Sequence, residues 1–185
     1  MSSPFEGRLV RLRAREPEDA ERSYVWANDF EVTRNIKIRY PQSHKSQRDW
    51  AVLTSAPDYN GGVFSIETLA NAELIGTCGL RTSQPENRCA TLAIWIGDKA
   101  YWDGGYGTDA MLVLCCFGFE MMNLHRIELD VYADNPRAQH VYERLGFVVE
   151  GRKRDHDFRA GRYRDTVMMG LLAGELRVPN REHST

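Results

Sequence analysis

A glycine-rich segment is the first place in this sequence where chemistry can be expected. The run from Trp102 to Thr108 (WDGGYGT) follows an expected strand and opens an expected helix. Glycines let successive backbone N–H groups turn toward one ligand, and a helix N-terminus adds about half a positive charge. The segment therefore predicts a receptor for a phosphate or pyrophosphate group. The same spacing also occurs in tight turns that bind nothing, so both interpretations stay open.

The glycines also fit one dinucleotide-binding motif. Gly105 to Ala110 matches G-x-G-x-x-A, and Asp130 and Asp134 follow roughly 20 to 30 residues later, as in nicotinamide-dinucleotide folds. Those folds repeat strand–helix–strand units and usually begin with the motif, whereas about 90 residues precede it here. A Walker A loop is excluded, because no Gly-Lys-Ser or Gly-Lys-Thr follows the glycines. A nicotinamide-dinucleotide site is therefore kept as an alternative.

A second segment of interest follows the next expected strand. It runs from Asn135 to Phe147 (NPRAQHVYERLGF), with Pro136 placed to begin a helix and Gly146 to end it. Asn135 is an expected helix cap. Tyr142 lies on this helix, where a tyrosine is either a core residue with a satisfied hydroxyl or a functional group.

Together the two segments resemble the GNAT superfamily of acyl-CoA-dependent N-acyltransferases. In layout they are most similar to the branch of ribosomal-protein N-terminal and spermidine acetyltransferases. In that family a Q/R-x-x-G-x-G/A loop cradles the coenzyme A pyrophosphate, and N-x-x-A-x-x-x-Y-x-x-x-G-F follows one strand later. The second pattern is complete here at Asn135, Ala138, Tyr142, Gly146 and Phe147. The first pattern has Trp102 where the family has Gln or Arg.

The resemblance implies which residues bind acetyl-CoA as co-substrate. The backbone around Trp95, Ile96 and Gly97 would pair with the pantetheine amides in the manner of an added strand. The pyrophosphate would be held by Trp102, Asp103, Gly104, Gly105, Tyr106, Gly107 and Thr108.

The same resemblance gives roles to the second segment. Asn135 and Arg137, at the start of the helix, would line the other side of the pantetheine arm. Tyr142 would be the catalytic general acid at the thioester sulfur.

Acyl transfer also needs a neutral amine, because an alkylammonium with a pKa near 10.4 has no lone pair to attack a thioester. Histone-type members of the superfamily place a Glu at the start of the fourth strand, and the matching position here is Thr91. Glu67, Glu128 and Asp130 lie on expected strands and could replace that carboxylate directly or through water. Strand carboxylates are more often exposed or salt-bridged, so no base is assigned.

The cysteines raise the alternative of a covalent acyl-enzyme. Cys115 and Cys116 lie in the apolar stretch from Met111 to Phe119, where burial raises a thiol pKa and no neighbouring His or Lys lowers it. Direct transfer in a ternary complex is therefore favoured. Cys78 and Cys89 form no CxxC pair, so reduced thiols are expected. The histidines have no ligand spacing, so no metal site is expected.

The elements that must position these residues follow from the pattern of apolar side chains. Strands are expected at residues 9–13, 63–69, 74–80, 91–96, 127–132, 147–151 and 164–172. Helices are expected at residues 16–28, 46–53, 108–122 and 136–145. An antiparallel meander thus precedes one strand–helix–strand unit. This order favours an α+β fold with a mixed, mostly antiparallel central sheet and flanking helices.

Composition sets the outer bounds. The 185 residues are 42% hydrophobic and 27% charged, which predicts one domain over residues 1–185 with a frayed polar tail at 177–185. A net charge of −2 offers no global attraction for nucleic acid. The apolar stretch from Met111 to Phe119 is far shorter than the roughly 20 residues that span a bilayer. No secretory signal is visible, so a cytoplasmic location is expected and no membrane partner.

The amine acceptor is the least determined part of the prediction. In the family it is shaped by the loop between the first two helices and by the last hairpin, here residues 29–45 and 154–164. The hairpin is Arg-rich but also carries acidic residues, so it suits neither a strongly acidic nor a plainly basic pocket, and a solvated hairpin is at least an equal interpretation. The expected activity is N-acetylation of a primary amine on a protein N-terminus or a small molecule, by a monomer or a homodimer. A non-catalytic acyl-CoA sensor is the alternative.

Overall fold

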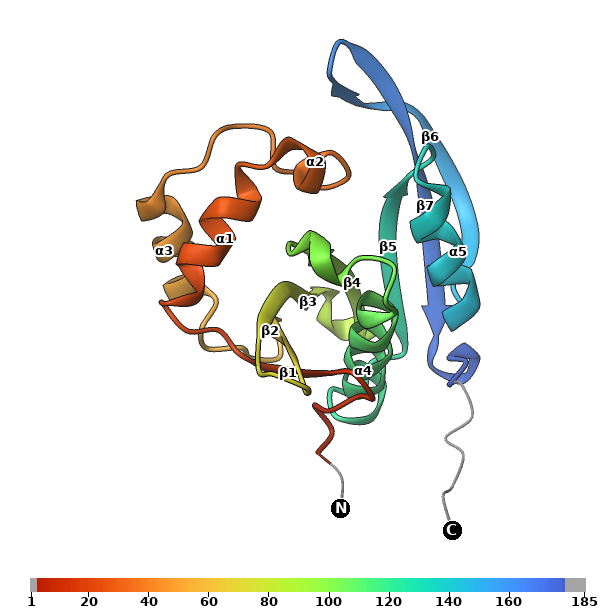
Figure 1. Cartoon of the computed structure of the whole chain (residues 1–185). Coiled ribbons are helices and arrows are strands. Elements are labelled where there is room, and N and C mark those ends of the chain that lie inside the picture. The colour runs from red at the N-terminus through yellow and green to blue at the C-terminus, as the bar shows by residue number, and fades with distance from the viewer. Residues whose placement is uncertain (1–2, 179–185) are drawn as a thin grey trace.

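The computed structural model describes residues 3–178, which form a seven-stranded sheet with helices on both faces (Figure 1). The strands are β1 (Val10–Ala14), β2 (Gly61–Thr68), β3 (Leu74–Gln84), β4 (Cys89–Ile96), β5 (Arg126–Tyr132), β6 (Val148–Arg159) and β7 (Arg162–Leu172). Their order across the sheet is β1-β2-β3-β4-β5-β7-β6. All neighbours are antiparallel except β4 and β5, which are parallel. The expected α+β class with a mixed, mostly antiparallel sheet is confirmed.

The helices lie in two layers. They are α1 (Asp19–Ala27), α2 (Phe30–Thr33), α3 (His44–Leu53), α4 (Tyr106–Glu120) and α5 (Pro136–Leu145), with 3₁₀ turns η1 (Pro85–Asn87), η2 (Lys99–Tyr101) and η3 (Ala173–Glu175). The central strand β4 separates the layers because side chains alternate along a strand. Ile94 and Ile96 pack into the core beneath α4, whereas the ring of Trp95 meets Trp26 of α1 edge-on at 6.2 Å. Helices α1 to α3 therefore face the opposite side of the sheet from α4 and α5.

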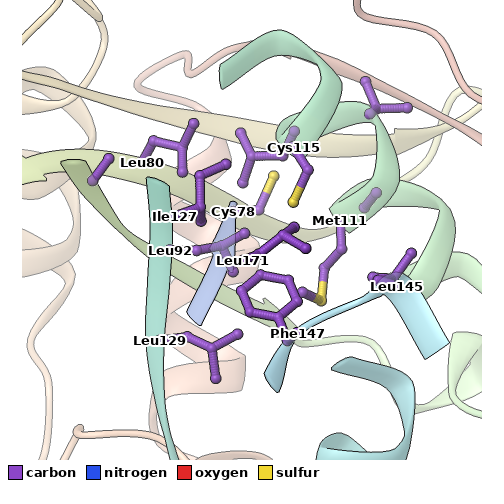
Figure 2. Close-up of a cluster of buried hydrophobic side chains, with 14 of the residues drawn as sticks. Cys78, Leu80, Leu92, Met111, Cys115, Ile127, Leu129, Leu145, Phe147 and Leu171 are labelled. Carbon is purple, nitrogen blue, oxygen red and sulfur yellow. The ribbon is translucent and has the colours of Figure 1, made fainter. Parts of the chain in front are cut away.

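The main core fills the space between the sheet and the α4–α5 layer (Figure 2). Met111 and Cys115 of α4 are fully buried against Ile127 of β5 and Leu171 of β7. Burial of a large aliphatic side chain stabilises a fold by about 1.5–3 kcal/mol. This packing fixes α4, and with it the glycine segment at its N-terminus.

Several predicted boundaries change once the structure is known, two of them near the site. Helix α4 begins at Tyr106, not at residue 108, so the last three residues of the glycine segment form the first helical turn. Strand β6 runs to Arg159 instead of ending at Gly151, and it forms with β7 a hairpin that extends beyond the rest of the sheet (Figure 1). Most of the hairpin segment at 154–164 is therefore strand, whereas the expected strands ended at residue 151 and began again at residue 164. The sequence shows no alternation of apolar and polar side chains here, because both faces of the hairpin are largely polar.

The expected loop at residues 29–45 also contains structure. Asp29 caps the short helix α2 by accepting hydrogen bonds from the N–H groups of Glu31 and Val32. Helix α3 begins at His44 and not at Ser46, because Ser43 is the cap and Ser46 completes a capping box with it.

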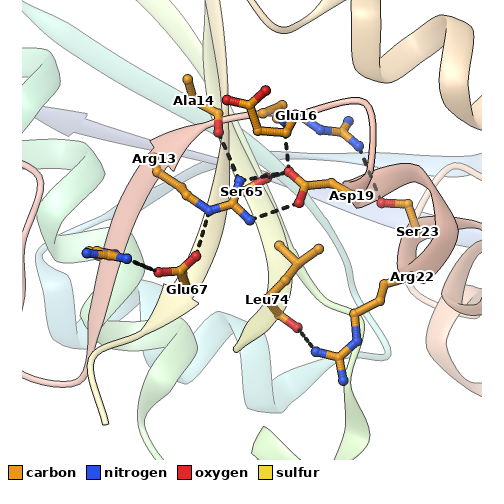
Figure 3. Close-up of polar contacts among 11 residues, drawn as sticks. Arg13, Ala14, Glu16, Asp19, Arg22, Ser23, Ser65, Glu67 and Leu74 are labelled. Atoms are coloured by element: carbon orange, nitrogen blue, oxygen red, sulfur yellow. Dashed lines mark hydrogen bonds and ion pairs between the residues drawn. The ribbon is translucent and has the colours of Figure 1, made fainter. Parts of the chain in front are cut away.

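A buried ion-pair network joins β1, α1 and β2 (Figure 3). The Arg13 guanidinium donates to the Asp19 carboxylate at 2.8 and 2.9 Å and to Glu67 at 2.7 Å. Arg11 donates to the other oxygen of Glu67 at 2.6 Å, and the Ser65 hydroxyl donates to Asp19 at 2.6 Å. Glu67 is thus a structural carboxylate of the network.

No helix within residues 3–178 is both long and apolar enough to cross a membrane. In the same range, no group of three or more His, Cys, Asp or Glu side chains is arranged to hold a metal ion. Of the tail expected to fray, residues 179–185 lie outside the described part of the chain. Arg177 is held by its N–H, which donates to the Leu145 carbonyl at 3.0 Å.

Candidate active site

The gap between β4 and β5 presents backbone groups at the centre of the sheet. The two strands pair from Cys89–Thr91 to Arg126–Glu128, and no further pair joins them within the described residues. The N–H groups of Gly97 and Asp98 both donate to the Ile75 carbonyl, at 2.8 and 3.1 Å, so they point toward β3. Because backbone direction alternates along a strand, the amides of Ile94 and Ile96 point into the gap. An extended chain with amides could pair with them as an added strand.

The three residues expected to pair with pantetheine therefore have different surroundings. Ile96 faces the gap, and its carbonyl accepts a hydrogen bond from the Trp102 indole at 2.9 Å. Trp95 carries its ring on the opposite face, where the indole N–H donates to the Thr77 hydroxyl. Gly97 packs under Trp26, whose ring would lie 2.2 Å from an added Cβ. Trp95 and Gly97 therefore pack against Trp26 on the α1 side of β4 and do not face the gap.

Two of the three glycines in the glycine segment have different explanations. Gly105 caps α4 with a φ of +83°, a conformation that side chains disfavour, so the backbone alone requires glycine there. Gly107 lies in the first turn of α4, and an added Cβ would meet only Ile96 Cγ1 at 3.5 Å and Cδ1 at 4.0 Å, which are ordinary contacts. The surrounding protein does not require glycine at 107. Glycine at 107 leaves the backbone beside Ile96 uncovered by a side chain.

The rest of the segment surrounds these glycines. Asp103 has a φ of +62° and is exposed, as is Gly104. Tyr106 packs edge-on against Tyr101 at 5.0 Å, and Thr108 is half-buried in the first turn of α4. The structure thus brings the predicted pyrophosphate residues together at one helix N-terminus.

Asp109, which the sequence analysis did not assign, fixes this helix N-terminus to β1. Its carboxylate accepts hydrogen bonds from the N–H groups of Arg8, Leu9 and Val10, at 3.1, 2.8 and 3.1 Å. These partners are about 100 residues away in sequence, so local spacing gave no signal of the contact.

The start of α5 lies opposite the glycine segment. The Asn135 side chain accepts a hydrogen bond from the Ala138 N–H at 3.3 Å, which confirms the expected helix cap. The Arg137 guanidinium pairs with the Asp103 carboxylate at 2.9 Å, and both side chains are exposed. This ion pair joins the start of α5 to the glycine segment.

Tyr142 lies five residues beyond Arg137, about 7.5 Å along the axis of α5. Its ring is part of the packing around the core, 6.0 Å from the ring of Phe147. Burial raises the pKa of Tyr142 to about 12. With this pKa the hydroxyl is protonated at neutral pH. No hydrogen bond to the hydroxyl is found among residues 3–178, so it is available as a donor.

Burial disfavours Cys115 as an acyl-enzyme nucleophile, whereas Cys116 is only partly buried. Cys78 and Cys115 are free thiols inside the core, and burial raises the pKa of both well above the ordinary value. A buried thiol that stays protonated is a poor nucleophile.

A large cavity lies on the other face of β4, under the loop that precedes α3. It encloses about 720 Å³. Its walls come from the loop at residues 36–38, from α3, and from the faces of β2, β3 and β4. Aromatic and aliphatic side chains dominate the lining: Ile36, Ile38, Trp50, Leu53, Ala56, Val63, Ala93 and Trp95. Cys78, Leu80 and Ile94 also border the cavity, but their side chains pack in the core on the other face of the sheet. Because β4 borders both this cavity and the gap, we call it the acceptor cavity.

The β6–β7 hairpin holds one wall of the acceptor cavity in place. The Arg159 guanidinium donates to the carbonyls of Ile36 and Ile38, at 2.5 and 2.9 Å. Arg164 donates to the Arg34 carbonyl at 2.8 Å and to Asn35 Oδ1 at 3.0 Å. The interpretation of a merely solvated hairpin is therefore wrong. The expected loop lines the cavity, and the hairpin positions the loop.

Two carboxylates lie on the acceptor face of β5. Glu128 accepts a hydrogen bond from the Thr91 hydroxyl at 3.4 Å and lies 3.6 Å from Arg126 Nε. Asp130 is 3.3 Å from Lys153 Nζ and 4.0 Å from Lys37 Nζ. Thr91 borders the cavity, so Glu128 is the nearer of the two to the position where histone-type relatives carry a base.

Comparison with known proteins agrees with this geometry. The sequence model of the acetyltransferase (GNAT) domain matches residues 9–148. The "Uncharacterized N-acetyltransferase p20" of Bacillus licheniformis is 32% identical over 177 residues, which cover 95% of this chain and 98% of that protein. The "Putative ribosomal N-acetyltransferase YdaF" of Bacillus subtilis is 30% identical over 173 residues, which cover 90% of this chain and 92% of that protein.

A solved structure with the same fold carries ligands. The crystal structure of spermidine N-acetyltransferase from Vibrio cholerae in complex with CoA and spermine superposes with a TM-score of 0.81 at 28% identity. The alignment covers 90% of this chain and 96% of that chain.

The chain belongs to the GNAT acetyltransferase family. It is an N-acetyltransferase that depends on acetyl-CoA. The alternative of a nicotinamide-dinucleotide fold is set aside, because one parallel strand pair is present within residues 3–178 and a dinucleotide fold needs several. The alternative of a non-catalytic sensor is set aside because the matching family model and the relatives are acetyltransferases.

Proposed function

We propose that this chain moves the acetyl group of acetyl-CoA directly to a primary amine in a ternary complex. The observation that carries the proposal is the glycine at 107, which the protein's own packing does not require and which lies beside Ile96 at the gap between β4 and β5. An anionic, amide-containing co-substrate fits this place, because an extended gap and a helix N-terminus meet there.

Each part of the co-substrate has residues that would bind it. The backbone groups of Ile94 and Ile96 would pair with the pantetheine amides. The N–H groups in the first turn of α4, around Gly107, would receive the pyrophosphate. Arg137 would exchange its exposed ion pair with Asp103 for a phosphate oxygen, which is a stronger partner for a guanidinium.

The transfer step balances in this arrangement. The amine nitrogen attacks the thioester carbonyl carbon, a C–N bond forms, and the C–S bond breaks. The nitrogen loses one proton and the departing sulfur gains one. The Tyr142 hydroxyl would donate to the sulfur as negative charge develops, since its pKa of about 12 keeps it protonated.

Substitution of Gly107 by Ala tests the proposal. Ala suits the first turn of a helix, so we expect the fold to be as stable as the wild type or slightly more stable. The added methyl would occupy the approach to the backbone, and we expect acetyl-CoA affinity to fall by about tenfold, or about 1.4 kcal/mol. Calorimetric titration with acetyl-CoA measures the loss.

Gly174→Ala is the matched control, because an added Cβ there meets nothing within 4 Å and the position lies in η3, away from the gap. Its affinity should equal that of the wild type. A folded Gly107→Ala protein with unchanged affinity would show that the pyrophosphate binds elsewhere.

A further inference from the structure

The acceptor cavity has an unusual balance of charge for an enzyme that must receive an amine. Among the described residues that line it, the only charged side chains are Lys37 and Arg81, and both are cationic. The polar remainder is neutral: Gln42, Ser46, Gln47, Thr54, Thr77 and Thr91. Two indole rings, Trp50 and Trp95, and several aliphatic side chains supply the rest of the wall. The described lining therefore offers a second positive charge on a substrate no carboxylate to pair with.

The nearest carboxylates on β5 do not change this balance. Asp130 is within 4.0 Å of two lysine ammonium groups, Lys37 and Lys153. Glu128 lies between the Thr91 hydroxyl and the Arg126 guanidinium. Each carboxylate therefore already has a cation of the protein beside it. A polycation would have to displace these partners and also give up its own hydration.

The same walls favour the reactive form of a suitable amine. Burial disfavours the charged form of any group, and like charges nearby act in the same direction. An ammonium that leaves water for this largely apolar cavity loses its proton more readily than it does in water. A cavity of this kind supplies a neutral amine without the strand carboxylate that Thr91 replaces.

We infer that the acceptor is a small primary amine on an apolar body without a second positive charge, bound in the acceptor cavity in its neutral form. This inference rests on the proposed function. A cavity of about 720 Å³ is within the range of small-molecule sites, roughly 300–1,000 Å³. An aromatic or alkyl body would pack on the two tryptophans and leave the amine toward β4, where the gap begins.

A matched pair of acceptors tests the inference. Hexylamine and 1,6-diaminohexane have the same length and differ by one ammonium group, and 2-phenylethylamine adds an aromatic body. Release of CoA from acetyl-CoA is measured with these, with spermidine and with an N-terminal tetrapeptide. We expect kcat/KM for hexylamine and 2-phenylethylamine to exceed that for 1,6-diaminohexane and spermidine by at least about tenfold. We also expect it to rise with pH as the free amine does.

The outcomes separate this inference from the proposed function. Preferred use of spermidine or the tetrapeptide would overturn the inference and leave acetyl transfer intact. If acetyl-CoA binds and no amine is acetylated, calorimetry of 2-phenylethylamine with the CoA complex decides: no binding overturns the inference. A protein that does not bind acetyl-CoA would instead contradict the proposed function.

A substitution in the cavity gives a second measurement. Ala93 is exposed on β4 and borders the cavity, so a carboxylate there stays solvated and should not unfold the protein. Ala93→Asp should lower the KM for 1,6-diaminohexane and raise the KM for hexylamine, each by about tenfold. Ala70→Asp, in the exposed turn between β2 and β3, is the control and should change neither. An Ala93→Asp protein with the preference of the wild type would contradict the assignment of the cavity.

Discussion

At the residue scale, Tyr142 is the group whose role can be measured most directly. Substitution by Phe keeps the ring packing and removes only the hydroxyl, for which residues 3–178 show no hydrogen-bond partner. If that hydroxyl donates to the departing sulfur, kcat should fall by about 10², near the lower end of general acid effects, because a thiolate is a fair leaving group. Acetyl-CoA affinity should change little. Steady-state kinetics under conditions where chemistry limits turnover, together with calorimetry, measure both quantities, and an unchanged kcat would remove Tyr142 from the mechanism.

Glu128 provides the opposite prediction. Its carboxylate lies beside Thr91, where a base would act, but Arg126 is 3.6 Å away and the acceptor is inferred to bind as a neutral amine. Glu128→Gln should therefore keep kcat within about threefold of the wild type, well below the 10² typical of a lost general base. The pH profile of kcat/KM should still follow the free amine. A loss of 10² or more, with a flattened acid limb, would identify Glu128 as the base.

Single residues also show what sequence could and could not predict. The Asn135 cap and the glycine at 105 follow from local chemistry, because caps and left-handed turns depend on neighbours in the chain. The placement of Gly97 depends on its register with β3, since only that register shows that its N–H is used by Ile75. Glu67 could be proposed as a base until Arg11 and Arg13 were found beside it on β1.

At the element scale, the β6–β7 hairpin acts on the acceptor cavity through the loop it holds. Arg159 donates to two main-chain carbonyls of the loop, and hydrogen bonds from a charged group contribute about 1.5–3 kcal/mol each when well formed. Arg159→Ala should loosen the wall at Ile36 and Ile38 and raise the acceptor KM by about three- to tenfold. Acetyl-CoA affinity should be unaffected, because the glycine segment is on the other side of β4.

Arg154→Ala is the control for this prediction. Arg154 is exposed on the same strand as Arg159. Kinetics of the two variants with one acceptor should differ, and equal effects would mean that general charge on the hairpin, not the clamp on the loop, governs acceptor binding.

The hairpin also shows why this element could not be predicted fully. A strand is usually recognised by alternation of apolar and polar side chains, but from Arg152 to Arg159 strand β6 has polar and charged side chains on both faces, and Phe158 is its one apolar residue. Its pairing is stabilised by contacts with distant residues, such as the Arg39–Asp157 ion pair. The helix α5, with Pro at its start and Gly at its end, needed no such contacts to be predicted.

At the scale of the whole molecule, the order of elements in the sequence was enough to predict the fold class. It was not enough to predict the acceptor cavity. An antiparallel meander before one strand–helix–strand unit already limits the sheet to a mixed type. The cavity is made where residues 36–54 of the loop and α3 cross the faces of β2 to β4, and such a meeting of distant segments has no local pattern. The chemistry of the co-substrate was therefore predictable, whereas that of the acceptor required the structure.

The stability of the whole molecule should depend on pH through the network of Figure 3. Burial by itself would raise the pKa of Asp19, but hydrogen bonds from Arg13, the Glu16 N–H and Ser65 lower it, and the net shift is downward. Burial by itself would also raise the pKa of Glu67, but hydrogen bonds from Arg13 and Arg11 outweigh it, and the net shift is downward. A carboxyl group with a lowered pKa in the folded state stabilises the fold above its unfolded pKa, near 3.9 for Asp and 4.3 for Glu, and this stabilisation is lost as the pH falls through the folded value.

We therefore expect the free energy of unfolding to be nearly constant between pH 6 and 8 with respect to this network and to fall below about pH 5. Asp19→Asn should be less stable than the wild type at pH 7, because Arg13 loses one of its two charged partners. It should also lose less stability between pH 5 and pH 3, because one of the titrating groups is gone. Urea unfolding at pH 7, 5, 4 and 3 measures both differences. Wild-type and Asp19→Asn curves that run parallel across this range would show that Asp19 does not contribute to the acid sensitivity of the fold.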